Sequence, residues 1–254
     1  MRCGAALTRG LCAMVLAGGW AAAGDAAEVR VLSAGAIQMA LIAAAPMFRT
    51  ESGHEIRVTY AIASELRRRV GGGEVADIVI APVAGVAALT KGDTVAAGEQ
   101  VVVGRVGAGI VARNGAPLPD ISSAEALKRA LLDAESVVYN RASSGVYIDS
   151  MLRKLGVYEQ ITAKLVRYDD GTAVMHHLMQ GKGREFGFGG ITDILMYRDK
   201  GLQLVGPLPE EIQNYTNYTA ARITAGANAG AAQAFLRYLA SPAGRTLFAA
   251  NGVK

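Results

Sequence analysis

Short apolar runs alternate with amphipathic segments along most of the chain. Each apolar run is followed by residues whose apolar positions recur three or four apart, which is the spacing of a helix. The turns between them are short and rich in Gly, Ser and Ala. This alternation predicts an α/β fold with mostly parallel sheets flanked by helices. The runs with the length of strands are residues 28–32, 55–60, 77–81, 136–139, 163–168 and 186–190.

Two stretches break this alternation. Residues 98–112 are apolar and punctuated by glycine without a helical period, so we expect a long strand, or two strands, crossing between lobes. Residues 213–221, QNYTNYTAA, are rich in amide, hydroxyl and phenol groups. A hinge strand whose Tyr215 or Tyr218 faces a cleft and an ordinary alternating strand fit this stretch equally well.

The length and composition indicate two globular lobes. A chain of 254 residues is longer than one small domain requires, and 51% hydrophobic against 19% charged residues excludes a disordered chain. We predict one lobe from residues 27–107 and 220–254, and a second lobe from residues 108–219. Two crossings would join them.

Residues 1–26 have the layout of a secretory signal peptide. Arginines precede an apolar stretch, and small residues follow it up to Ala26, so we expect cleavage there and delivery to the periplasm. Both cysteines, Cys3 and Cys12, fall inside this segment. The mature chain would then have no disulfide, no thiolate metal site and no cysteine nucleophile.

The charged and histidine residues do not predict a nucleic-acid or metal site. The formal charge is only +4, and the cluster Arg67 to Arg69 lies on a predicted helix without interleaved aromatic residues. His176 and His177 are adjacent, and neighbouring residues on a helix point about 100° apart, which does not suit one metal ion. We therefore expect no nucleic-acid partner, no metal and no cofactor.

Residues 136–155, SVVYNRASSGVYIDSMLRKL, carry the most suggestive chemistry. An apolar strand ends at the turn of Ser143, Ser144 and Gly145, and a helix follows. The start of a helix exposes unpaired backbone N–H groups and the positive end of a dipole, so this turn suits a carboxylate or an oxyanion. Arg141 could add a charged fork. The alternative is a turn that only caps its helix.

Seven segments, in this order, resemble a known family. They are VRVLSAGAI, ESGHEIRVTY, SELRRRVGGGEVADIVIA, AGIVARNGAPLPD, KLGVYEQI, EFGFGGITDIL and AFLRYLASPAGRTLFAANG. Together they are similar to the type II periplasmic solute-binding proteins of ABC importers, and most of all to the molybdate-binding branch. The resemblance implies two α/β lobes that close by hinge motion on a small anionic ligand. It also implies a monomer that delivers its ligand to a permease in the inner membrane.

The resemblance implies ligand contacts in the turns that follow the strands. In the first lobe these are Ser33, Ala34, Gly35, Ala36, Ala63 and Ser64. In the second lobe they are Ser143, Ser144, Gly145, Tyr147, Gly189, Gly190 and Ile191. Molybdate-binding members have a serine-rich second turn, and a tyrosine where this chain has its glycine pair. This departure, together with Arg141, favours an organic carboxylate over molybdate.

An enzyme class resembles the same branch. Aconitate isomerases look like molybdate-binding proteins and shift a double bond in a tricarboxylate without metal or cofactor. The stretch GPLPEEIQNYT and the Ser-Ser-Gly turn with its tyrosine are similar to that class. Such a reaction needs a general base and donors that stabilise an enolate-like charge. Tyr147, Tyr215 or one of the histidines is the candidate base, and a binding protein and an isomerase stay open as alternatives.

Overall fold

The computed structural model describes residues 26–254, so the predicted signal peptide lies outside the described residues, apart from its last residue. The strands are β1 (Glu28–Ala34), β2 (Glu55–Ala61), β3 (Ile78–Pro82), β4 (Val95–Arg113), β5 (Ser136–Asn140), β6 (Leu165–Tyr168), β7 (Glu185–Gly190), β8 (Leu202–Pro207) and β9 (Tyr215–Ile223). The α-helices are α1 (Gln38–Ser52), α2 (Ala63–Gly71), α3 (Val83–Lys91), α4 (Ala124–Asp133), α5 (Ser143–Lys154), α6 (Tyr158–Ile161), α7 (Gly171–Gln180), α8 (Ile191–Leu195), α9 (Ala229–Ala240) and α10 (Pro242–Ala250). Within residues 26–254 there are also the 3₁₀ helices η1 (Gly35–Ile37), η2 (Thr162–Lys164), η3 (Arg198–Lys200) and η4 (Glu210–Ile212).

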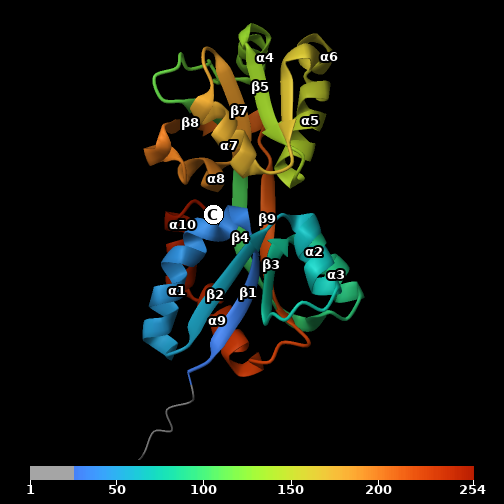
Figure 1. Ribbon diagram of the computed structural model, residues 1–254, viewed down its shortest axis with the longest axis vertical. Coiled ribbons are helices and arrows are strands. Elements are labelled where there is room, and N and C mark those ends of the chain that lie inside the picture. Colours follow the sequence, from blue (N-terminus) through green and yellow to red (C-terminus); the bar gives the residue numbers. More distant parts are fainter. Residues whose placement is uncertain (1–25) are drawn as a thin grey trace, which may run out of the picture.

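The predicted α/β architecture is confirmed. The strand order is β2-β1-β3-β9-β4-β7-β5-β6, and β8 also pairs with β4. β1 runs parallel to β2 and β3, and β5 runs parallel to β6 and β7, while β4 and β9 are antiparallel to their neighbours. Figure 1 shows β1 to β3 with α1 to α3 in the lower half of the molecule, and β5 to β8 with α4 to α8 in the upper half.

The buried apolar side chains form separate cores in the two halves. One core contains β1, β3, α1 and α9 residues and reaches Val106 and Tyr218. The other buried clusters begin at Ala108 and end at Leu208, and they enclose β5, β7 and α7. We call the two halves the first and the second lobe. The limits at 107/108 and 219/220 stay a prediction, although the change of core on β4 falls close to the first of them.

The long crossing strand expected at residues 98–112 is present. β4 has 19 residues, and it pairs with β9 from Gln100 to Gly107 in the first lobe and then with β7 from Ala108 to Val111 in the second. β4 and β9 therefore form the connection between the lobes (Figure 1). No helix within residues 26–254 has both the length and the apolar character that a membrane crossing requires.

Candidate functional site

A cavity of about 470 Å³ lies between the two cores. From the first lobe it is lined mainly by Ala34, Gly35, Ala36, Gln38, Tyr60, Ala61, Ile62, Ala63, Glu65 and Pro82. From the second lobe it is lined mainly by Asn140, Ala142, Ser144, Asp169, Asp170, Gly171, Thr172, Met175, Gly190, Asp193, Met196 and Tyr197. The crossing strands contribute Val106, Gly107, Ala108, Thr216 and Tyr218, and Asn214 lies just before β9. Its volume is in the range of pockets for small ligands.

Five helical segments place residues of their first turn in the cavity lining. They are η1, α2, α5, α7 and α8, which follow β1, β2, β5, β6 and β7 respectively. The carboxyl ends of parallel strands meet at one edge of a sheet, so the helices that follow them start side by side. The first N–H groups of each helix have no partner within the helix, and they carry its positive dipole end. The cavity is therefore surrounded by backbone donors.

Most of these helix starts have no side-chain cap. The N-cap residues Ala34, Ile62, Ala142 and Gly190 make no capping hydrogen bond through a side chain. Away from the cavity, serine side chains cap α4 and α10, whereas α9 begins without a side-chain cap. The exception at the cavity is α7, where Asp170 Oδ1 accepts from Ala173 N at 2.9 Å. The missing caps leave the N–H groups to bind something else.

The polar side chains in the cavity are neutral donors and carboxylates. Among the described lining residues there is no lysine, arginine or histidine. Amide and hydroxyl groups come from Gln38, Asn140, Ser144, Thr172, Asn214 and Thr216, and phenols come from Tyr60, Tyr197 and Tyr218. Burial raises the pKa of Tyr60 to about 12, so this phenol keeps its proton at neutral pH.

Three of the four carboxylates in the cavity already have partners. Glu65 is paired with Arg68, whose hydrogen bonds hold the Glu65 pKa below its ordinary value. Asp169 Oδ1 accepts from Arg141 Nη1 at 2.9 Å. Asp170 caps α7. These three groups are therefore committed within the protein.

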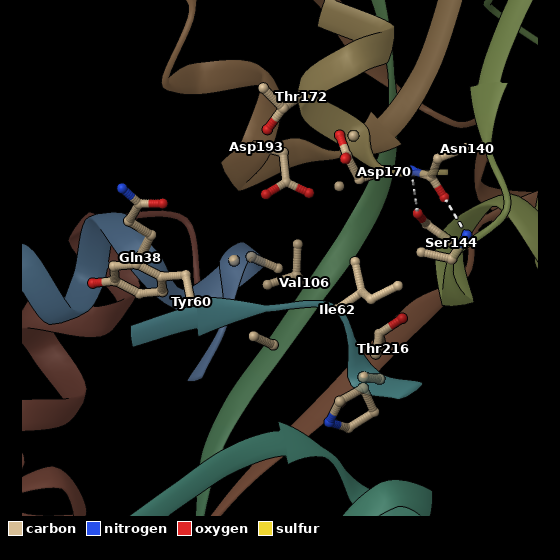
Figure 2. Close-up of a pocket in the computed structure, with 18 of the residues that line it drawn as sticks. Gln38, Tyr60, Ile62, Val106, Asn140, Ser144, Asp170, Thr172, Asp193 and Thr216 are labelled. Atoms are coloured by element: carbon tan, nitrogen blue, oxygen red, sulfur yellow. Dashed lines mark hydrogen bonds between the residues drawn. The ribbon is translucent and has the colours of Figure 1, made fainter. Parts of the chain in front are cut away.

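The fourth carboxylate, Asp193, lies in the first turn of α8 and points into the cavity. In Figure 2 its oxygens face the open space, with Gln38 and Tyr60 on one side and Asp170 and Asn140 on the other. Within residues 26–254 no hydrogen bond or ion pair reaches it, and burial raises its pKa to about 6. The neighbouring carboxylate and burial also raise the pKa of Tyr218, burial being the larger cause.

The structure brings together some of the site residues predicted from the sequence. Those that line the cavity are Ala34, Gly35, Ala36, Ala63, Ser144 and Gly190. Those outside its lining are Ser33, Ser64, Arg141, Gly145, Tyr147, Gly189 and Ile191. Ser143 begins α5, and its side chain lies outside the described part of the chain. A ligand-binding role for each of them stays a prediction.

Several residues outside the lining have structural contacts instead. Ser33 is fully buried, and its hydroxyl donates to the Ala34 carbonyl at 3.1 Å. A Cβ on Gly145 would lie 1.6 Å from the Asn140 carbonyl oxygen, so glycine allows α5 to pack against the end of β5. The guanidinium of Arg141 holds Asp169 at the rim and is half exposed.

The candidate bases also lie outside the cavity lining. Tyr147 donates its hydroxyl to the Ile212 carbonyl at 2.8 Å. Tyr215 is 40% exposed, and the Arg105 guanidinium lies over its ring, 4.2 Å from the ring centre. Tyr218, and not Tyr215, faces the cavity. His177 Nδ1 contacts the Tyr168 hydroxyl at 2.9 Å.

Sequence reasoning missed Asp193, Gln38, Tyr60 and Thr172. Each lies within a few residues of a predicted turn, so the turns pointed to the right edge of the sheets. The sequence did contain a signal for Asp193, because it follows the predicted ligand turn of Gly189 and Gly190, and a carboxylate at that place would lie near the expected ligand.

Residues 29–254 match the family described as bacterial extracellular solute-binding protein. An aconitate isomerase from Pseudomonas sp is 28% identical over 241 residues, which are 92% of this chain and 90% of that protein.

Two solved structures share the fold at low sequence identity. The periplasmic molybdate-binding protein of Azotobacter vinelandii superposes with a TM-score of 0.73 at 14% identity, over 89% of this chain and 98% of that one. The sulfate-binding protein SubI of Mycobacterium tuberculosis superposes with a TM-score of 0.68 at 17% identity, over 89% of this chain and 86% of that one. Proteins with this fold thus include two that are named for binding tetrahedral oxyanions, molybdate and sulfate.

Proposed function

The chain belongs to the family of bacterial extracellular solute-binding proteins, and from this premise we propose that it captures a small anion, an organic carboxylate or an oxyanion, between its lobes. The observation that carries the proposal is the convergence of five helix starts on one cavity, four of them without a side-chain cap. Backbone N–H groups and helix dipoles bind anions without a cationic side chain. The cavity lining, which has no lysine or arginine among its described residues, agrees with this mode of binding.

The family and the predicted signal peptide also support a cellular role for the protein. We propose a periplasmic receptor that is monomeric and passes its ligand to an ABC permease in the inner membrane. β4 and β9 are the segments about which the lobes would close on the ligand. Closure would bring the donors of η1 and α2 towards those of α5, α7 and α8.

A thermal-shift panel tests anion capture. The purified mature chain is heated with molybdate, tungstate, sulfate, phosphate, citrate or trans-aconitate, and with sodium chloride at matched ionic strength. At least one anion is expected to raise the melting temperature well beyond the chloride control, because a ligand that binds only the folded state stabilises it. No shift with any of them would overturn the proposal.

A matched pair of variants locates the bound anion. Ala63 and Ala229 are each the first residue of a helix whose N-cap residue makes no side-chain cap, but only Ala63 lines the cavity. Ala63→Asp places a negative charge at the proposed site and is expected to weaken anion binding at least tenfold. Ala229→Asp makes the same change at α9 and is expected to leave the affinity unchanged. Equal affinities for both variants would place the anion elsewhere.

A second function is favoured by one specific observation, the similarity to aconitate isomerase across almost the whole chain. In this reading the cavity holds a tricarboxylate, and Asp193 moves the proton, since a carboxyl with a pKa of about 6 suits general acid–base work. The test is a proton NMR time course of cis-aconitate mixed with the protein. If the wild-type chain forms trans-aconitate and the Asp193→Asn variant does not, the protein is an isomerase that uses Asp193. An unchanged spectrum with the wild-type chain would exclude the isomerase function.

A further inference from the structure

The cavity combines features that oppose each other. Its helix starts favour an anion, whereas Asp193 adds a carboxylate to the same space. An ionised carboxylate next to a bound anion disfavours both charges, unless a proton lies between them. The ligand must therefore satisfy the helix starts and this carboxylate together.

Two glycines keep the space beside this carboxylate open. A Cβ on Gly190 would lie 3.0 Å from Asp193 Oδ2, and a Cβ on Gly171 would lie 3.9 Å from the same oxygen. Gly190 is the N-cap of α8, and Gly171 is the first residue of α7. Oδ2 therefore lies close to the backbone at the start of α7 and just before α8, and these residues line the same cavity.

Other charged or titratable groups do not neutralise Asp193 within the described structure. The titratable residues that share the cavity are Tyr60, Glu65, Asp169, Asp170, Tyr197 and Tyr218. Of these, the three carboxylates have partners of their own, and burial raises the pKa of Tyr60 and Tyr218, so these two phenols keep their protons at neutral pH. The elements that pack on α8 are β4, β7, β8, α7 and η1, and none of them places a lysine, arginine or histidine in the cavity lining.

We propose that Asp193 selects anions that carry their own hydrogen-bond donor, such as a hydroxyl group or an acidic O–H, over anions that have none. Ionised Asp193 accepts a charge-assisted hydrogen bond from such a ligand. An anion without a donor leaves the carboxylate unpaired and facing a second negative charge. This inference depends on the proposed capture of an anion, and it names the class of anion.

Two pairs of probes differ mainly in the donor. Hydrogen phosphate carries a proton at pH 7.5 and sulfate does not; citrate carries a hydroxyl group and tricarballylate does not. Isothermal titration calorimetry at pH 7.5 is expected to show wild-type protein binding the donor member of at least one pair ten times more tightly or better. Asp193→Asn offers both a donor and an acceptor at the same place, so the preference is expected to fall at least tenfold.

A charge control and a pH series complete the design. Asp169→Asn also removes a negative charge from the cavity, and it is expected to raise both affinities of a pair together without changing their ratio. Lowering the pH from 7.5 to 5 protonates Asp193 in wild-type protein, so sulfate binding is expected to strengthen at least tenfold. The same change is expected to have little effect in Asp193→Asn. Because the pH series is measured on wild-type protein, it tests the role of Asp193 even if a variant folds poorly.

The results separate this inference from anion capture itself. Equal affinities within both pairs, or a preference that survives Asp193→Asn, would overturn the selection by Asp193 while leaving capture intact. Binding of molybdate or tungstate without binding of any of these four anions would overturn the selection alone. Failure of the folded wild-type protein to bind these four anions or any other anion of the thermal-shift panel would overturn capture, and the selection with it.

Discussion

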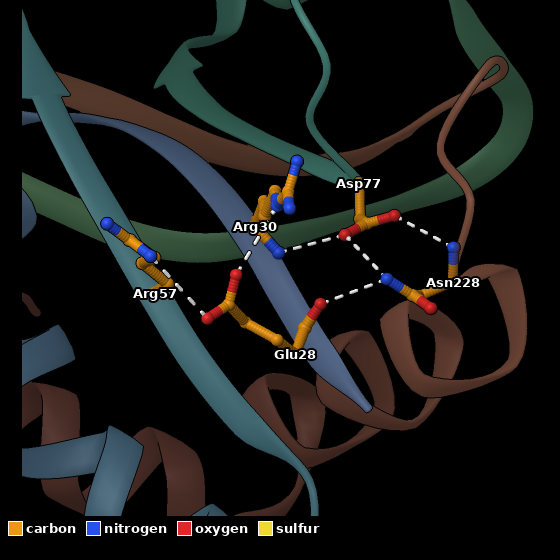
Figure 3. Close-up of polar contacts among 5 residues, drawn as sticks. All are labelled: Glu28, Arg30, Arg57, Asp77 and Asn228. Carbon is orange, nitrogen blue, oxygen red and sulfur yellow. Dashed lines mark hydrogen bonds and ion pairs between the residues drawn. The ribbon is translucent and has the colours of Figure 1, made fainter. Parts of the chain in front are cut away.

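Two aspartates, Asp77 in the first lobe and Asp193 in the cavity, show how differently this fold uses the same side chain. Asp77 is 2% exposed and fully engaged. It accepts from the backbone N–H groups of Arg30 at 2.8 Å and Asn228 at 2.9 Å, and from the Asn228 side chain at 3.4 Å (Figure 3). Asp193 has no protein partner among the described residues, and burial raises its pKa.

The difference separates a structural carboxylate from one that is free for a ligand. Asp77 precedes β3 and joins it to β1 and to the start of α9, and Asn228 extends the network by donating to the Glu28 carbonyl at 2.9 Å. Its cost of burial is offset within the protein. The cost of burying the Asp193 carboxylate is not offset by a protein partner. The ligand-free protein therefore keeps an unpaired carboxylate where a ligand can bind it.

The largest expected effect is the loss of the Asp77 network. Asp77→Ala leaves two part-buried backbone N–H groups and the Asn228 side chain without their acceptor, so the free energy of unfolding is expected to fall by about 3 kcal/mol. Urea denaturation at pH 7 measures it, with Asp193→Ala as the matched control that should not destabilise. A loss below about 1 kcal/mol for Asp77→Ala would remove the contrast between the two aspartates.

Asp193→Asn is expected to raise the free energy of unfolding, which is the opposite of the effect at Asp77. Because the folded pKa of about 6 lies above the ordinary value near 4, the wild-type protein loses stability as the pH rises from about 4 to about 6. A shift of the Asp193 pKa from near 4 to about 6 corresponds to about 3 kcal/mol in the free energy of unfolding, and water in the cavity reduces this value. Asp193→Asn should therefore be about 2 kcal/mol more stable than wild type at pH 7, and equally stable below pH 4. A variant less stable at pH 7 would show that the carboxylate has a partner.

A smaller effect is expected at the glycine beside this carboxylate. Gly190→Ala brings a methyl group 3.0 Å from Asp193 Oδ2 and 3.4 Å from Val106, so the neighbours must shift at a cost of about 1 kcal/mol. In a double-mutant cycle with Asp193→Ala, much of this cost should disappear. Additive changes in the free energy of unfolding would place the Asp193 side chain away from Gly190.

The smallest effect is expected for Arg141→Ala. Its ion pair with Asp169 is exposed, and such pairs contribute less than about 1 kcal/mol to stability. Urea denaturation should show a change below about 0.5 kcal/mol. A tenfold loss of affinity for a carboxylate ligand in the same variant would indicate that Arg141 leaves Asp169 to bind it, as the sequence reading expects.

The strand-to-helix pattern sufficed to predict the α/β architecture and the edge where the cavity lies. It could not show which side chains reach the cavity, because that depends on how each helix start is oriented. Glu125 and Asp193 are both acids in the first turn of a helix, yet Glu125 is exposed and Asp193 points into the cavity. The helix pattern does not separate the two; only the place of Asp193 after the predicted ligand turn of Gly189 and Gly190 does.

Gly145 and Arg141 show the same limit for long-range contacts. The Ser-Ser-Gly turn suggested a ligand cradle, but the close approach of Gly145 to the Asn140 carbonyl is a packing constraint that appears only once α5 is placed on β5. Arg141 meets a carboxylate 28 residues further along the chain, which sequence spacing does not reveal.

The most direct test of this account is the titration of Asp193 itself. Carboxyl ¹³C NMR of aspartate-labelled protein without ligand, assigned by comparison with Asp193→Asn, follows the ionisation of this group over pH 3 to 8. The account predicts a midpoint near pH 6, because burial without a partner disfavours the charged form. A midpoint at or below pH 4 would show that Asp193 is solvated or paired, and would contradict its role as the free carboxylate of the cavity.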